Sequence, residues 1–200
     1  MGRWEPNARG RLAKAALTLY AEQGFEQTTA AEIARSAGLT ERTFFRHFAD
    51  KREVLFYGSD SLLDLLVQAV ADAPPAAGPV DAVSAALQAV GAMIQETPEP
   101  ARLRYAVVSA NQELRERELA KFGEFAATIA AALRDRGVPE LAASLAAETG
   151  TAVYRVTFAR WIAGQAQLDL PELLRESMAE LRDVVADRLL SSPASWPPGR

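Results

Sequence analysis

A short charged segment, GLTERTFFRHFADK at residues 38–51, contains the side chains whose types and spacing could do chemistry. Its arginine, threonine, histidine and lysine side chains are hydrogen-bond donors of the kind that contact DNA phosphates and base edges. Arg42 and Arg46 are four residues apart, so in a helix they lie on the same face. The major groove of B-DNA is roughly 12 Å wide and admits such a helix, which can offer its arginines to guanine. The pattern therefore favours nucleic-acid recognition.

Three phenylalanines stand inside this segment. Phe44 and Phe48 are also four residues apart, and we expect both to point inward against Leu19, Ile33 and Leu39. Phe45 is left at the rim, where its ring can lie against a sugar or a thymine methyl group. A merely solvated helix face is the alternative reading. The residues expected to contact DNA, with Thr43, His47 and Lys51 at phosphates, are Thr29, Thr40, Glu41, Arg42, Thr43, Phe45, Arg46, His47 and Lys51.

The composition argues against most catalytic chemistry. The chain has no cysteine and one histidine, so it offers neither a thiolate nor a zinc site of His and Cys ligands. No Asp-His-Ser arrangement or carboxylate pair is suggested near His47, which argues against a catalytic base there. We expect a protein that is not an enzyme and uses no cofactor and no metal. An enzyme with an apolar pocket, or a helical adaptor with an incidental basic head, remain the alternatives.

The elements that must position these residues are expected to be helices. A first amphipathic helix covers the periodic apolar residues of 12–20. Thr28 or Thr29 can cap a second helix, with Glu32 at capping-box distance from Thr29. Thr40 caps a short third helix, and the tetrapeptide AGLT before it is typical of a helix-turn-helix. Asp50 is expected to cap a long fourth helix.

Breaks that contain proline or glycine divide the rest of the chain into further helices. They lie at 73–79, 97–100, 136–139 and 168–171, and no stretch alternates as a strand would. The predicted fold is all-α, with three short helices followed by about six longer ones. The expected domains are a helix-turn-helix DNA-binding domain at 1–52, a helical ligand-binding and dimerisation domain at 53–190, and a disordered tail at 191–200.

Charge is unevenly distributed. Residues 1–52 hold nine Lys/Arg and six Asp/Glu, net +3, whereas the remaining residues hold 13 and 20, net −7. A basic head on an acidic body is typical of a DNA-binding module joined to a domain that does not bind DNA, although scatter in surface charge gives similar totals. The first ten residues contain no apolar run, and Arg155 and Arg160 interrupt the most apolar later stretch. These features predict a cytoplasmic protein with no membrane segment.

From about residue 7 to residue 60 the chain resembles the DNA-binding domain of TetR/AcrR-family regulators. The resemblance is carried by ALTLYAEQGFEQTTAAEIARSAGLTERTFFRHFADKREVLF, in which the small-residue turn, Thr43, the aromatic pair, His47, Phe48 and Lys51 stand in register. It implies a homodimer that represses transcription from a palindromic operator. In the family a tyrosine often stands at the position of Phe45, and its hydroxyl reaches a phosphate. Phe45 cannot form that bond.

The resemblance also implies an all-helical C-terminal domain with a small-molecule pocket and a dimer face built from the last two helices. The residues FARWIAGQ and DLPELL at the junction of those helices are similar to actinobacterial-type regulators that sense acyl-CoA or other apolar ligands. We expect a largely hydrophobic ligand, with pocket walls at Leu62, Leu65, Leu66, Met93, Tyr105, Phe122, Phe125, Tyr154, Phe158 and Trp161. The dimer face is expected at Ala152, Leu173, Leu181 and Val184.

Overall fold

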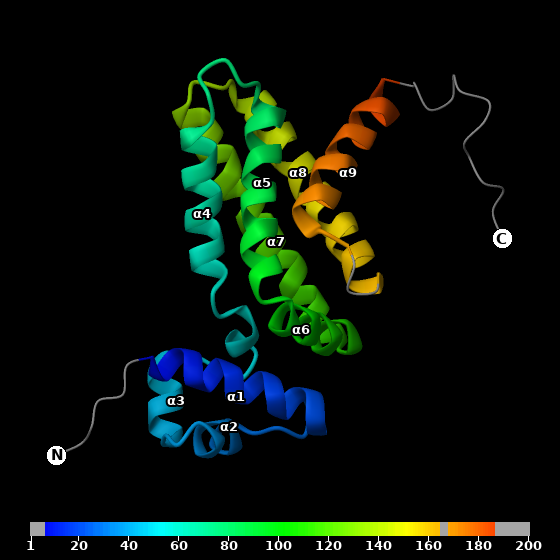
Figure 1. The fold of residues 1–200 in the computed structure, drawn as a ribbon. Coiled ribbons are helices and arrows are strands. Elements are labelled where there is room, and N and C mark those ends of the chain that lie inside the picture. Colours follow the sequence, from blue (N-terminus) through cyan, green and yellow to red (C-terminus); the bar gives the residue numbers. More distant parts are fainter. Residues whose placement is uncertain (1–6, 165–167, 187–200) are drawn as a thin grey trace. The chain divides into compact units, whose positions relative to one another are not determined.

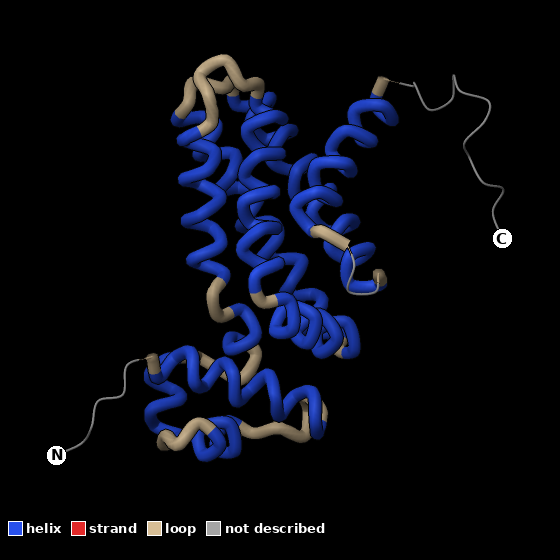
Figure 2. Tube along the Cα trace, viewed as in Figure 1, coloured by secondary structure: helices blue, strands red, loops and turns tan. Residues whose placement is uncertain are grey.

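The computed structural model describes residues 7–164 and 168–186, and the tail expected at 191–200 lies outside them. Every regular element in the described residues is a helix, so the predicted all-α fold is confirmed (Figure 1, Figure 2). The elements are α1 (Ala8–Gln23), α2 (Ala30–Ser36), α3 (Glu41–His47), the 3₁₀ helix η1 (Glu53–Phe56), α4 (Ser59–Asp72), α5 (Pro79–Glu96), α6 (Pro98–Ala110), α7 (Gln112–Asp135), α8 (Glu140–Ala163) and α9 (Leu170–Val185).

Contacts between residues divide the chain into two compact units. The first unit is Met1–Asp64 with Thr97–Gly123, and the second is Leu65–Glu96 with Glu124–Arg200. This division differs from the expected domain boundary after residue 52. The reason is that side chains of α6 and of the start of α7 belong to the same hydrophobic core as α1, α2 and α3.

Helix ends in the first unit follow local sequence signals. Gly24 ends α1 with a φ of 91°, a left-handed conformation that glycine adopts at little steric cost. Thr29 starts α2 through a complete capping box, in which its side chain and that of Glu32 each accept the other residue's backbone N–H. The Thr40 side chain starts α3 by accepting the N–H of Thr43. Of the two caps predicted for α2 the structure uses Thr29, and the predicted cap of α3 and the predicted end of α1 are confirmed.

One hydrophobic core holds the helices of the first unit together. Phe44 is fully buried and Phe48 is 3% exposed, which confirms the inward orientation predicted from their spacing. They share this core with fully buried Leu12 and Ile33. The later helices α6 and α7 add apolar side chains, among them Leu114, to the same cluster. Because Phe44 and Phe48 pack in this core, the opposite face of α3 points to solvent.

The expected long fourth helix is wrong in its first turns. Asp50 accepts the N–H groups of Arg52 at 2.8 Å and Glu53 at 3.1 Å, but the helix that follows is the single 3₁₀ turn η1. Gly58, with a φ of 90°, interrupts the chain before α4 begins. All three apolar side chains of η1, Val54–Phe56, are buried in the first-unit core, and the single apolar face of an uninterrupted α-helix could not bury three consecutive residues.

The segment Glu53–Asp72, which covers η1 and α4, is long and apolar enough to cross a membrane by length and composition alone. The core helix of a folded domain passes the same test, and the buried side chains of η1 belong to such a core.

Ion pairs connect the segment after α3 to α7 within the first unit. Arg52 bridges Asp50, at 2.6 Å, and Glu113 of α7. Glu53 pairs with Arg117, one turn further along α7. Each pair is partly exposed and by itself stabilises the fold only slightly.

In the second unit α5, α8 and α9 pack against one another. Glycines at two crossings let the helix backbones approach closely. A Cβ atom on Gly150 of α8 would lie 2.3 Å from Val83 of α5, and one on Gly91 of α5 would lie 2.8 Å from Leu174 of α9. Larger residues at either glycine would push the helices apart.

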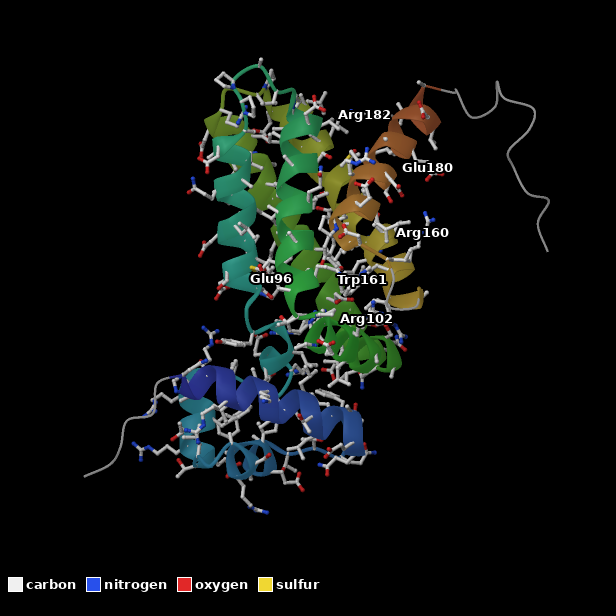
Figure 3. The ribbon with its side chains drawn as sticks, in the orientation of Figure 1. Glu96, Arg102, Arg160, Trp161, Glu180 and Arg182 are labelled. Carbon is white, nitrogen blue, oxygen red and sulfur yellow. The ribbon has the colours of Figure 1, made fainter. Side chains whose placement is uncertain are left out.

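Polar contacts fasten helix ends in the second unit. Arg136 donates to carbonyl groups at the end of α4, the position where helix carbonyls lack intrahelical partners. The Asp169 side chain caps α9 by accepting the Glu172 N–H at 2.8 Å. Arg182 of α9, labelled in Figure 3, pairs with Asp81 of α5.

Candidate nucleic-acid interface

Helices α2 and α3 form a helix-turn-helix in the first unit. The turn between them contains Gly38, whose φ of 66° reverses the chain at little steric cost. The N–H of Leu39 donates to the carbonyl of Ala34 at 2.8 Å, and the Arg11 side chain of α1 donates to the carbonyl of Ala37. These bonds hold the turn that joins the two helices.

Helix α3 has one buried face and one exposed face. The fully buried Phe44 ring meets the Phe45 ring edge to face, with centroids 5.3 Å apart. Phe45 itself is 53% exposed, and Arg42 and Arg46 are both exposed. Each guanidinium presents a planar fork of N–H donors, beside which Phe45 presents an apolar ring. This face carries the donor and apolar groups that direct readout of a duplex groove requires.

The other residues expected on α3 are placed at its two ends. Thr40 and Glu41 are exposed at its start, and the hydroxyls of Thr40 and half-buried Thr43 lie 2.9 Å apart. The Nε2 atom of His47 is buried and has no hydrogen-bond partner among the described residues. An unpaired buried nitrogen costs free energy, so this atom is a candidate for a partner outside the described residues.

The side chains of two expected contact residues, Thr29 and Lys51, form hydrogen bonds to other residues of the same chain. The hydroxyl of Thr29 donates to the carboxylate of Glu32 at 2.8 Å and also serves as the α2 cap. The ammonium of Lys51 donates to three carbonyl groups of the loop between α1 and α2. An ammonium has three N–H donors, so this geometry leaves Lys51 no free donor for the phosphate that the sequence led us to expect.

Among the groups of this unit whose pKa is shifted by hydrogen bonds, charges or burial are Glu32, Asp50 and Tyr20. The backbone N–H and the hydroxyl of Thr29 lower the pKa of Glu32. Burial would raise the pKa of Asp50, but hydrogen bonds from Arg52 outweigh it and the pKa is lowered. Burial, with the charge of Asp50, raises the pKa of Tyr20. Because both carboxylates have lowered pKa values in the folded state, their stabilising effect is present at neutral pH and is lost as the pH falls through those values.

Replacing Thr29 with alanine is expected to lower the free energy of unfolding by about 1 kcal/mol, because α2 loses its N-cap acceptor. The variant Thr29→Ser keeps the hydroxyl and should retain the stability of the wild type. Chemical denaturation of both variants measures the difference. Equal losses in the two variants would contradict a role for the capping hydroxyl.

Three aromatic residues expected in a ligand pocket form a continuous apolar stack on α8, in the second unit. Phe158 lies between Tyr154 and Trp161, with ring centroids 5.4 Å from each. Trp161, labelled in Figure 3, is fully buried, and its indole N–H donates to the carbonyl of Leu168 at 3.1 Å. The expected pocket residues divide between the units, with Leu65, Leu66, Met93 and Phe125 also in the second and Leu62, Tyr105 and Phe122 in the first. The pocket stays a prediction.

The residues expected in a dimer face have different surroundings. Ala152 of α8 is exposed, Val184 of α9 is 51% exposed, and Leu181 is half-buried. Leu173 is 5% exposed and packs inside the second unit, so its assignment to a dimer face is corrected. A side chain that its own chain already covers offers no surface to a second copy.

Sequence reasoning missed three exposed apolar residues on α8. Leu141, Leu145 and Val156 are 72%, 59% and 71% exposed, and with Ala152 they recur at helical spacing on one face. The spacing alone signals an apolar face, but it does not show whether that face is covered by the same chain. The exposed Glu148 lies between Leu145 and Ala152 on this face and divides the apolar residues into two groups. Exposed apolar groups that share a helix face mark a candidate site of protein association.

Comparison with known proteins gives matches across both halves of the chain. Residues 12–57 match the family model for bacterial regulatory proteins of the tetR family. Residues 77–186, more than half of the chain, match the model for the MftR C-terminal domain.

Individual relatives agree with these matches. The HTH-type transcriptional regulator TcmR of Streptomyces glaucescens is 38% identical over 82 residues, which are 41% of this chain and 36% of that protein. The chain thus matches about a third of the length of this curated relative. Thermus thermophilus FadR, solved in complex with lauroyl-CoA, is 25% identical over 96% of this chain and 100% of its own, with a TM-score of 0.58. FadR from Bacillus halodurans shares the fold, at 17% identity over 90% of this chain and 96% of its own, with a TM-score of 0.64.

Proposed function

The chain belongs to the TetR family of bacterial regulatory proteins, and from this premise we propose that it is a ligand-responsive repressor that binds a palindromic operator as a homodimer. The observation that carries the proposal is the exposed face of α3, where Arg42, Arg46 and Phe45 stand above a buried phenylalanine core. Such a regulator acts on DNA in the cytoplasm, and we assign it no catalytic role.

In this proposal α3 enters the major groove. Arg42 and Arg46 contact guanine edges, and the ring of Phe45 lies against a sugar or a thymine methyl group. Thr43 and His47 contact phosphates, which position the helix without reading sequence. Lys51 is left out of the contact set because its donors are already used.

The dimer face that we propose is the uncovered apolar face of α8 together with the exposed end of α9. On α8 it consists of Leu141, Leu145, Ala152 and Val156, and α9 adds Val184. A two-fold symmetric dimer uses the same surface on both copies, so one apolar face is enough to build it. The two copies of α3 then fix the spacing of the half-sites.

Selection of binding sites from random-sequence DNA by the purified protein tests the operator proposal. The expected result is a palindrome whose half-site centres are about 34–36 Å apart or a multiple of that distance. A single half-site should bind poorly. Recovery of unrelated sequences with no shared half-site would contradict a sequence-specific operator.

The effector that we propose is an acyl-CoA-like molecule with a long apolar chain, bound in the second unit near the ring stack of α8. The support is the similarity to Thermus thermophilus FadR, which was solved with lauroyl-CoA, and the apolar character of Tyr154, Phe158 and Trp161. A ligand shifts DNA affinity only if it binds one conformation better than another.

Lauroyl-CoA is expected to weaken operator binding by about 5–150-fold, the usual range of allosteric coupling, whereas coenzyme A alone should have little effect. Titration of the protein–operator complex measures both. If lauroyl-CoA has no effect at saturating concentration, the acyl-CoA assignment is wrong, and the operator proposal is unaffected.

A further inference from the structure

Lys51 connects two parts of the helix-turn-helix that the turn itself does not join. We propose that Lys51 is a positioning residue for DNA recognition and does not contact a phosphate. The inference rests on the proposed DNA binding by α3. It concerns what holds α3 in place, and its direct consequence can be measured in the free protein.

The ammonium of Lys51 is held by the loop between α1 and α2. It donates to the carbonyls of Phe25 at 2.8 Å, Glu26 at 3.2 Å and Thr28 at 3.1 Å. It also lies 4.4 Å from the centroid of the Phe25 ring, where the face of an aromatic ring attracts a cation. Three carbonyls and one ring therefore surround the ammonium.

The backbone of Lys51 is fastened as well. The buried Tyr20 hydroxyl donates to the Lys51 carbonyl at 2.5 Å. The Tyr20 ring meets the Phe25 ring edge to face, with centroids 5.2 Å apart. Burial raises the pKa of Tyr20, so this hydroxyl keeps its proton and remains a donor at neutral pH. Both ends of Lys51 are thus fixed to α1 and to the loop that follows it.

The Lys51 contacts join segments that lie before and after the helix-turn-helix in the chain. The turn at 37–40 joins the end of α2 to the start of α3. Lys51 follows the end of α3, and the loop at 24–29 precedes the start of α2. Lys51 therefore connects the end of α3 with the loop before α2, two segments that the turn does not join. Loss of this connection would let α3 tilt on α2 and misplace the arginines that face the groove.

The two roles for Lys51 predict different responses to salt and to DNA sequence. A lysine that contacts a phosphate contributes to binding of every DNA sequence, and its loss lowers the slope of log affinity against log salt by about one unit. A lysine that positions α3 contributes mainly to base readout. Its loss lowers the preference for the operator and leaves the salt slope unchanged.

The variant Lys51→Met removes the ammonium and keeps a side chain of similar length. We expect the ratio of operator affinity to random-DNA affinity to fall by about ten-fold, as after loss of one bidentate base contact, with an unchanged salt slope. Lys51→Arg keeps the positive charge, but its planar guanidinium cannot direct three donors from one nitrogen at the three carbonyls. It should therefore resemble Lys51→Met, whereas a phosphate contact would tolerate arginine.

Lys14→Met is the matched control, because Lys14 is an exposed lysine on α1 and its loss changes the net charge equally. Amide hydrogen exchange of the free protein gives a second readout. Residues 24–29 should exchange faster in both Lys51 variants and at the wild-type rate in the Lys14 variant. This measurement needs no DNA, so it separates failure of the positioning role from failure of the operator proposal.

A salt slope lower by about one unit, with an unchanged operator preference, would overturn the inference and return Lys51 to the phosphate contacts. Full binding by Lys51→Arg would overturn it too. So would unchanged exchange at 24–29 in both variants, because the contacts would then not hold the loop.

Discussion

A variant with Leu145→Glu and Val156→Glu is expected to be monomeric and to bind the operator about 10²–10⁴-fold more weakly than the wild type. Both residues are exposed in the single chain, at 59% and 71%, on the α8 face that we propose for the dimer. In a two-fold interface each introduced carboxylate would lie unpaired in an apolar contact and close to its own copy. Separate protomers would then engage half-sites independently and lose the advantage of linked binding.

Analytical ultracentrifugation measures the oligomeric state, and titration of the operator measures the affinity. The control is Leu119→Glu, which changes a leucine that is 51% exposed on α7, outside the proposed dimer face. It should remain dimeric and bind the operator as the wild type does. A double variant that stays dimeric would place the interface elsewhere. A monomer with full affinity would remove the need for a dimer.

The double substitution Arg42→Ala and Arg46→Ala is expected to reduce the free energy of operator binding by about 2–6 kcal/mol, since each bidentate arginine–guanine pair discriminates by about 1–3 kcal/mol. Both arginines are exposed on α3, so truncation removes donors without opening the core. Binding to random DNA should fall much less, because it depends on phosphate contacts.

Each single variant and the double variant should be titrated against the operator and against random DNA at one salt concentration. Arg134→Ala is the control, because Arg134 lies at the end of α7 in the second unit and pairs with Glu140 at 3.0 Å. Operator and random DNA that weaken equally would show that the two arginines contact only phosphates. The substitutions should leave the thermal unfolding transition unchanged, since neither side chain is buried.

The sequence by itself determined most elements of this protein and the faces of its shortest helices, while the start of the predicted fourth helix was wrong. The caps at Thr29 and Thr40 and the end of α1 at Gly24 are local features, formed within a few residues of the chain. The inward orientation of Phe44 and Phe48 follows from helical periodicity alone. The resemblance that suggested a DNA-binding regulator lies in the same local segment, and the family matches agree with it.

The tertiary structure decided which partner each side chain takes. Lys51 is next to α3 in the chain, but its ammonium meets a loop more than twenty residues earlier. In the same way the charged residues Arg52 and Glu53 pair with α7. The type of a charged residue limits the partners with which it can form hydrogen bonds. The tertiary structure decides which of these partners lies within hydrogen-bonding distance.

The same limit applies to apolar faces. Leu173 of α9 and Leu145 of α8 are both leucines within helices, but Leu173 is 5% exposed and Leu145 is 59% exposed. An apolar residue in a helix can be covered by the same chain or by a second copy, and the sequence does not state which. That distinction depends on how α5, α8 and α9 cross, and the crossings depend on close contacts at Gly91 and Gly150 between residues far apart in sequence. Helix formation is governed by bonds between near neighbours, whereas burial is governed by contacts that exist only after the chain has folded.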